Sequence, residues 1–261
     1  MRSAQDLRDP EILGPPSRWL YLTEPARGAL SVNALPFALP FLARAPRGDG
    51  HGVVVLPGLL ATDMSTTPLR RFLSHLGYDV QGWQLGRNLG PTTEVLDGMR
   101  HAVPELAEST GSTVSLVGWS LGGIYARELA REFPSLVRRV VTLGSPFALT
   151  DARQSRAERA YRSQAHLHTL GPLPSRAEVA RPIPVPSTAI YSRFDGIVAW
   201  QGCIEETSAL HENIEVRCAH LGFGIDPATL WAIADRLAQP EGSHTPFRAT
   251  GALRWLYPEG R

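Results

Sequence analysis

The amino-acid sequence predicts an α/β fold built on a doubly wound, mostly parallel sheet with helices on both faces. Short β-branched, apolar runs alternate with helical patterns along most of the chain, as they do in consecutive βαβ units. The first run, residues 52–56, is apolar throughout (Gly-Val-Val-Val-Leu), which is typical of a strand buried on both faces of a parallel sheet. With 261 residues, 43% of them hydrophobic, the chain is long enough for one large domain of this class.

The elements in the first part of the chain follow from periodicity and turn residues. Residues 1–50 are expected to form an irregular or partly helical lead-in that ends in a Pro-Arg-Gly-Asp-Gly turn. After the first strand, a helix is expected to begin at residues 66–68 (Thr-Thr-Pro), because proline favours the first turn of a helix. A second strand is predicted at 78–83, and a helix at 93–108 that Pro104 should kink or shorten.

The second half of the chain continues the alternation. Strands are expected at 139–143, 187–191 and 214–218, and the last helix follows Asp226-Pro227, where the aspartate caps the first turn. Right-handed crossovers between parallel strands then place helices on both faces of the sheet.

A strand–turn–helix pattern at residues 114–127 lies at the centre of the predicted sheet. It holds Gly118-x-Ser120-x-Gly122 between strand-forming residues and a helical pattern, the setting in which this motif forms a nucleophile elbow. Each glycine removes a side chain that would collide with the neighbouring element. Ser120 is therefore expected in a strained conformation, with its hydroxyl open to a base and to a substrate carbonyl. Because the motif also arises by chance, its catalytic reading depends on finding a base and an acid.

Catalytic groups in a doubly wound sheet should follow the carboxyl ends of strands. Asp195 follows the strand at 187–191, and His220 follows the strand at 214–218. The expected catalytic residues are therefore Ser120, Asp195 and His220. Histidine can accept the serine proton near neutral pH, and the aspartate fixes the imidazole tautomer.

Other ionisable residues fit these two roles less well. His51 and His211 precede strands, so they are expected at the wrong end of the sheet. Glu205 and Glu206 fall within the element that follows Asp195, and they remain the alternative acids.

A tetrahedral intermediate also requires hydrogen-bond donors for its oxyanion. One donor is expected from the backbone of Leu121, the residue after the nucleophile. The other should come from the turn after the first strand, Pro57-Gly58-Leu59, where the Leu59 N–H is the preferred candidate and that of Leu60 is the alternative. The predicted oxyanion hole is thus Leu59 with Leu121.

The segment 147–186 interrupts the alternation, because no strand pattern occurs in it. Residues 152–170 have helical propensity, and residues 171–186 are rich in proline. An insertion of this length at the top of a sheet is often a cap over a site, and a surface excursion without function is the alternative. The expected organisation is a lead-in at 1–50, a core at 51–146 and 187–239, a cap at 147–186 and a C-terminal tail at 240–261.

Taken together, these motifs resemble the α/β-hydrolase superfamily, and within it the bacterial lipases and esterases. The resemblance covers residues 52 to about 239 and is carried by Gly-Trp-Ser-Leu-Gly-Gly at 118–123, Ser-Arg-Phe-Asp-Gly-Ile-Val at 192–198 and His-Leu-Gly at 220–222. It implies the roles given above for the serine, acid, base and oxyanion residues. Two departures stand out: Pro57-Gly58 replaces the His-Gly of many lipases, and no strands are evident before residue 50, so the first two strands of the fold are expected to be missing.

Composition limits the other functions of the chain. A net charge of +1 gives no sign of a nucleic-acid partner. Cys203 and Cys218 are expected to be buried free thiols, with a single bridge as the alternative, and neither a metal nor a cofactor is expected. No export signal is evident, which predicts a cytoplasmic protein. The apolar stretch 29–43 contains Pro36 and Pro40 and is too short to span a bilayer; it should cover the core, or else contact a membrane surface.

The expected function is hydrolysis of carboxylic esters through an acyl-enzyme, with a small-molecule or lipid ester as substrate. Apolar side chains near the elbow, Leu59, Leu60, Trp119 and Leu121, favour an acyl group over a peptide or a sugar. Two alternatives remain open at this point. One is acyl transfer to an acceptor other than water with the same triad, and the other is a non-catalytic hydrolase-fold protein that serves for binding.

Overall fold

The sheet of this protein has six strands, all parallel, in the order β2-β1-β3-β4-β5-β6. The computed structural model describes residues 14–169, 171 and 173–258. The strands are β1 (Gly52–Leu56), β2 (Asp79–Gly82), β3 (Val114–Trp119), β4 (Val137–Leu143), β5 (Ser187–Ser192) and β6 (His211–Val216). The strand order reverses between β1 and β3, and ligands of doubly wound sheets bind at such a switch point. The predicted fold class is confirmed. In the described residues the first strand begins at Gly52, in agreement with the expected loss of the first two strands.

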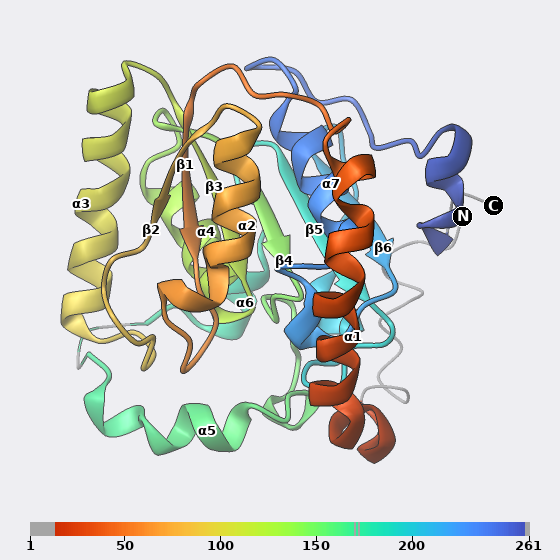
Figure 1. Cartoon of the computed structure of the whole chain (residues 1–261). Helices are drawn as coiled ribbons and strands as arrows, with labels where there is room; N and C mark the ends of the chain where they lie inside the picture. The colour runs from red at the N-terminus through yellow and green to blue at the C-terminus, as the bar shows by residue number, and fades with distance from the viewer. Residues whose placement is uncertain (1–13, 170, 172, 259–261) are drawn as a thin grey trace.

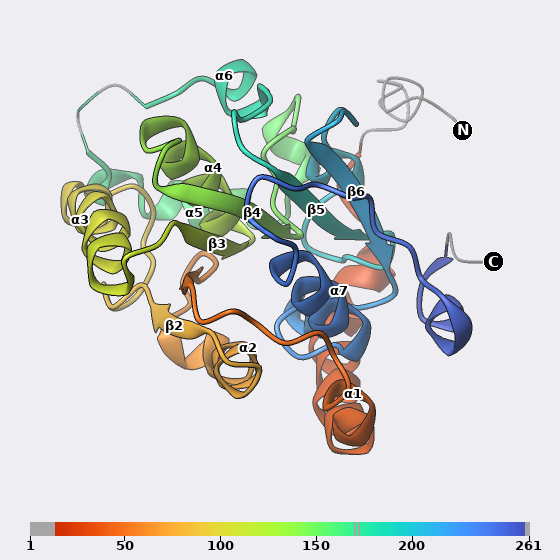
Figure 2. The same cartoon turned by 90° about the horizontal axis from the view of Figure 1, so that it is seen from above.

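Helices cover both faces of the sheet (Figures 1 and 2). On one face lie α1 (Arg18–Leu42), α2 (Asp63–His75) and α7 (Pro227–Leu237), and on the other lie α3 (Thr93–Thr110) and α4 (Leu121–Glu132). Each face has its own apolar core. One core joins β1, β3 and β4 to α2 and α7 through side chains such as Val55, Leu73 and Ile233, and the other joins β1 and β3 to α3 and α4 through Val54, Met99 and Ala126.

The segment between β4 and β5 crosses the carboxyl end of the sheet, where Figure 1 shows α5 beneath the strands. It contains short helical pieces instead of the continuous helix that its propensity suggests. These are a 3-10 turn at Ala152–Gln154, α5 (Glu158–Ser163), a 3-10 turn at Ala165–Leu167 and α6 (Arg176–Ala180). Some residues of the expected lead-in (1–13), cap (170 and 172) and tail (259–261) lie outside the described part of the chain.

Prolines lie inside α1 and α3 without ending either helix. The lead-in contains a 25-residue helix, α1, although Pro25, Pro36 and Pro40 lie inside it. All three prolines are exposed, so the carbonyls that lose a helical partner face water rather than the protein interior. In α3 the helix likewise continues past Pro104, and it ends at Gly111, which adopts a φ of 61°.

Other boundaries also differ from those expected. Helix α2 begins at Asp63 with Thr62 as its N-cap, so Pro68 lies inside the helix and not at its start. Strand β6 covers His211–Val216, three residues earlier than expected at its start, because its first residues are polar yet buried. The predicted cap of α7 is confirmed, since Asp226 accepts the backbone N–H of Thr229 at 3.0 Å.

Part of the expected C-terminal tail packs on the domain. A 3-10 turn at Gly251–Trp255 precedes Tyr257, which is buried and donates its hydroxyl proton to the carbonyl of Ala228 at 2.7 Å. In the described part of the chain, no helix combines the length and the hydropathy needed to cross a bilayer.

Candidate active site

Ser120 lies in a tight turn between β3 and α4. Its φ of 53° and ψ of −120° are rarely adopted by a residue with a side chain, and such strain is concentrated at functional sites. The turn is tight enough to require glycine on both sides. A Cβ at Gly118 would lie 2.3 Å from the Cα of Gly123, and a Cβ at Gly122 would lie 2.3 Å from the carbonyl oxygen of Leu56. The strand–turn–helix motif therefore folds as the sequence predicts.

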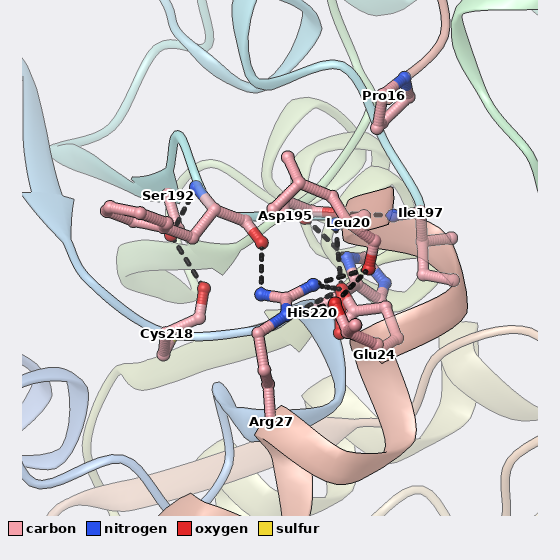
Figure 3. Close-up of polar contacts among 12 residues, drawn as sticks. Pro16, Leu20, Glu24, Arg27, Ser192, Asp195, Ile197, Cys218 and His220 are labelled. Atoms are coloured by element: carbon pink, nitrogen blue, oxygen red, sulfur yellow. Dashed lines mark hydrogen bonds and ion pairs between the residues drawn. The ribbon is translucent and has the colours of Figure 1, made fainter. Parts of the chain in front are cut away.

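Asp195 and His220 meet at the same edge of the sheet (Figure 3). Asp195 follows β5, and its Oδ2 lies 2.6 Å from Nδ1 of His220. Its other oxygen, Oδ1, accepts the backbone N–H groups of Ile197 and Val198, each at 2.8 Å. With both oxygens engaged, the carboxylate is held in one orientation, in which it can fix the tautomer of His220.

His220 is bound to the elbow as well as to the acid. The indole Nε1 of Trp119, the residue before the nucleophile, donates to the carbonyl of His220 at 3.1 Å. Burial of the imidazole lowers its pKa, but the charge and hydrogen bond of Asp195, together with the charge of Glu24, outweigh this effect. The pKa of His220 is consequently raised above its ordinary value of 6.5. Among the described residues, Ser120 Oγ and His220 Nε2 form no hydrogen bond, and in the absence of substrate such a bond is often long or poorly aligned.

The alternative acids lie away from His220. Glu205 is buried and forms an ion pair with Arg127 at 2.8 Å, and it also accepts the hydroxyl of Ser187 at 2.6 Å. Glu206 is exposed. Of the three candidate acids, Asp195 is the one whose carboxylate contacts the imidazole of His220.

The turn after β1 is fixed by Asn88, a buried residue that sequence reasoning missed. Asn88 donates its side-chain amide to the carbonyl of Pro57 at 2.8 Å, and its own carbonyl accepts the N–H of Leu60 at 2.7 Å. This second bond uses the N–H of the alternative oxyanion donor. Within the described residues, the Leu59 N–H has no acceptor. Leu121 is the first residue of α4, so its N–H has no helical carbonyl as acceptor.

Asn88 also stabilises the turn at Pro57-Gly58, which differs from the His-Gly of many lipases. Although Pro57-Gly58 replaces His-Gly, the hydrogen bonds from Asn88 hold the turn in place. Gly58 is close enough to the elbow that a Cβ there would lie 3.2 Å from the Cβ of Ser120. No local motif marks Asn88, since its partner Pro57 is 31 residues away.

Ser120 opens into a cavity of about 580 Å³. Its walls are mostly apolar, and its lining includes Leu59, Leu96, Met99, Leu121, Ile124, Leu129, Phe147 and Leu149. The segment at 147–186 supplies part of the wall through Phe147, Leu149, Tyr161, Leu173 and Val179. A cavity of this size with mostly apolar walls suits an acyl chain better than a polar group.

Glu24 is the second residue that sequence reasoning missed. It lies on α1, and its carboxylate accepts the backbone N–H of His220 at 2.8 Å (Figure 3). No local pattern singles out this glutamate in the sequence, and 196 residues separate it from its partner.

Cys203 and Cys218 are both buried and free, as expected. Burial raises the pKa of each thiol well above its ordinary value, so neither is a reactive thiolate. Among the described residues, no three His, Cys, Asp or Glu side chains gather as the ligands of a metal ion would.

Comparison with known proteins places this geometry in a known fold. No family model matches the chain. It is 30% identical over 114 residues to the pimeloyl-[acyl-carrier protein] methyl ester esterase of Shewanella sp. (strain MR-7). That alignment covers 42% of the chain and 40% of the relative, so the chain matches about two fifths of the relative's length.

Two solved structures superpose on a larger part of the chain. Lipase B of Aspergillus fumigatus has a TM-score of 0.57 at 18% identity, covering 74% of this chain and 53% of that one. The monoacylglycerol lipase of Paleococcus ferrophilus has a TM-score of 0.51 at 17% identity, covering 74% of this chain and 96% of that one. The chain therefore has the α/β-hydrolase fold and is similar to lipases and esterases that share it.

Proposed function

We propose that the protein is a serine hydrolase of carboxylic esters and that Ser120, Asp195 and His220 are its catalytic triad. The observation that carries the proposal is the 2.6 Å contact between Asp195 and His220 at the sheet edge where the strained Ser120 opens into an apolar cavity. The names of the relatives support the reaction class, since they include an esterase of a methyl ester and two lipases.

In this mechanism Ser120 Oγ attacks the ester carbonyl carbon while His220 Nε2 takes the hydroxyl proton. Asp195 keeps Nδ1 protonated and stabilises the imidazolium that forms. The negative charge on the former carbonyl oxygen is bound by the N–H groups of Leu59 and Leu121. His220 then returns its proton to the departing alkoxide, which leaves an acyl group on Ser120. Water, activated by His220, attacks this ester and releases the acid.

The segment at 147–186 acts in this proposal as the wall that holds the acyl chain. Tyr161 lines the cavity, whereas Leu167 in the same segment does not. Contacts remote from the reacting bond add transition-state binding only for chains long enough to reach them.

The test is kcat/KM for p-nitrophenyl esters of increasing chain length, with wild type, Tyr161→Ala and the matched control Leu167→Ala. Hydrolysis that Ser120→Ala abolishes supports the proposed reaction. A loss in Tyr161→Ala that grows with chain length, with Leu167→Ala near wild type, supports the acyl wall. If no ester is turned over, the reaction class is wrong; if Tyr161→Ala loses activity equally on all chain lengths, the wall assignment is wrong.

Acyl transfer to an alcohol uses the same residues and differs only in the second step. Product analysis in water with added alcohol distinguishes the two reactions, because an acyltransferase would form the new ester in preference to the free acid.

A further inference from the structure

Helix α1 packs directly against the two loops that carry Asp195 and His220. Glycines on both sides of this contact allow the close approach. A Cβ at Gly28 of α1 would lie 3.1 Å from the Cβ of Leu221, and one at Gly222 would lie 2.9 Å from the hydroxyl of Ser31. A Cβ at Gly196 would lie 2.4 Å from the carbonyl oxygen of Leu20. The helix thus touches the loop after β5, at Gly196, and the loop after β6, at Leu221 and Gly222.

Glu24 is the polar centre of this contact. Its side chain is buried, with 1% of the residue exposed, and one oxygen, Oε1, accepts two backbone N–H groups. These come from Gly196, the residue after the acid, and from His220 itself, each at 2.8 Å. A single carboxylate oxygen therefore ties together the backbones that carry the proposed acid and the proposed base (Figure 3).

A simple ion pair with Arg27 does not account for the burial of the Glu24 carboxylate. Arg27, one turn along α1, lies 3.7 Å from Oε1 and donates its hydrogen bonds elsewhere, to the carbonyls of Phe194 and Leu20, each at 2.6 Å. Oε2 of Glu24 is buried and has no hydrogen-bond partner among the described residues. Burying a carboxylate with one oxygen unpaired costs free energy. A group retained at such a cost suggests a role beyond packing.

We propose that Glu24 is a positioning residue of the triad, which holds the loops of Asp195 and His220 in register through Oε1 and presents a negative charge to the imidazole. This inference rests on the proposed function, because it assumes that His220 acts as the base. In this proposal, α1 holds the loops of the acid and the base together through Glu24.

The charge of Glu24 should be measurable at His220. The acidic groups that act on the imidazole are Asp195 and Glu24, and both raise its pKa. Arg27 lies 3.7 Å from Oε1 of Glu24, and the carboxylate of Asp226, which follows the base loop, accepts the hydroxyl of Thr229. Removing only the charge of Glu24 should therefore lower the pKa of His220.

Two variants separate the hydrogen bonds from the charge. Glu24→Gln keeps an oxygen that can accept both N–H groups, whereas Glu24→Ala removes the oxygens as well as the charge. Leu42→Ala is the matched control, because Leu42 is a fully buried residue at the C-terminal end of α1, many residues along the helix from Glu24. It should lower Tm without altering the triad.

The readouts are kcat and KM for a short-chain ester as a function of pH, and the titration of His220 by NMR. Glu24→Ala is expected to lower kcat on the order of 10–100-fold with KM nearly unchanged, since small displacements of catalytic groups have effects of this size. Glu24→Gln is expected to keep most of kcat, while the acid limb of the profile and the pKa of His220 both move to lower pH.

The proposal is overturned if Glu24→Ala resembles Leu42→Ala, with a lower Tm and an unchanged kcat. It is equally overturned if Glu24→Gln leaves the His220 titration where it is in wild type, a measurement that remains available should Glu24→Ala not fold. The NMR titration and the rate of Ser120 labelling by a fluorophosphonate do not require ester turnover. They therefore test Glu24 even if the protein proves not to hydrolyse esters.

Discussion

Two Ser–His–Asp arrangements lie in the described part of the chain, one at each end of β3. At the carboxyl end, Asp195 contacts His220 beside Ser120. At the amino end, Asp49 Oδ1 lies 2.5 Å from Nδ1 of His51, and Nε2 of His51 lies 2.8 Å from the hydroxyl of Ser115. By hydrogen bonding alone, the second arrangement is the more complete of the two.

The two serines differ in accessibility and in backbone strain. Ser115 is fully buried within strand β3, with 0% of its surface exposed, and its hydroxyl is already engaged by His51. Ser120 instead lies in a strained turn and lines the cavity. A nucleophile needs room for its substrate, so accessibility at the strand end, and not the hydrogen-bond chain, distinguishes the candidate active site.

The two histidines also have opposite pKa shifts. For His51, burial and the nearby charges of Arg138 and Arg139 outweigh its contacts with Asp49, and the pKa is lowered. For His220, burial is outweighed by Asp195 and Glu24, and the pKa is raised. A base that must receive a proton during the reaction benefits from the second environment, in which the charged form is stabilised.

The largest effect is expected from Ser120→Ala. It should lower ester hydrolysis on the order of 10⁶-fold, because triad residues act as a unit and little activity remains without the nucleophile. The assay is kcat/KM on the best p-nitrophenyl ester, with circular dichroism to confirm the fold. Retention of most activity by the purified variant would contradict the assignment of Ser120.

Asp195→Asn should follow, with a loss on the order of 10⁴-fold, because an asparagine holds the wrong imidazole tautomer. Asp49→Asn changes the corresponding acid at the other end of the sheet and should leave kcat near wild type. Turnover numbers of Asp195→Asn, Asp49→Asn and a third variant, Glu205→Gln, check which residue is the acid. Nearly normal turnover by Asp195→Asn together with an inactive Glu205→Gln would move the acid to Glu205.

A smaller effect is expected from pH. His220 must be neutral to accept the serine proton, and its pKa lies above 6.5. As the pH falls below the pKa of His220, kcat/KM should decline about tenfold per pH unit. The profile between about pH 5 and 9 shows where the limb lies, and His51→Gln should leave it in place. An acid limb well below 6.5 would mean that a different group is titrating.

The smallest effect on activity is expected from Ser115→Ala. This change leaves Nε2 of the buried His51 without its partner, which should lower the free energy of unfolding by about 1–3 kcal/mol. Chemical denaturation measures this loss, and kcat at a permissive temperature should remain close to wild type. A large loss of kcat in the folded variant would show that the two ends of β3 are not independent.

The sequence predicted the fold, and it pointed to the candidate site, because both depend on local patterns. Apolar runs identified the strands, and the rule that catalytic groups follow strand ends selected Asp195 and His220. Both residues follow strands in the structure, and although β6 begins three residues earlier than expected, His220 still lies after it. It also set His51 aside as lying at the wrong end, where the structure places it.

The contacts made by Asn88 and Glu24 could not be predicted in this way. Asn88 reaches a turn 31 residues away, and Glu24 reaches a loop 196 residues away, so no periodic pattern connects the partners. The length of α1 was missed for a related reason. Proline disfavours a helix interior, but its cost is reduced where the freed carbonyls face water, and exposure depends on the packing of the whole domain.

The most direct test of the account is covalent labelling with a fluorophosphonate, followed by intact-mass and peptide mass spectrometry. Wild type and Ser115→Ala should each take up one phosphonyl group, on the peptide that contains Ser120, and Ser120→Ala should take up none. An unlabelled wild type, or an adduct that persists in Ser120→Ala, would contradict the claim that the strained serine at the carboxyl end of β3 is the activated nucleophile.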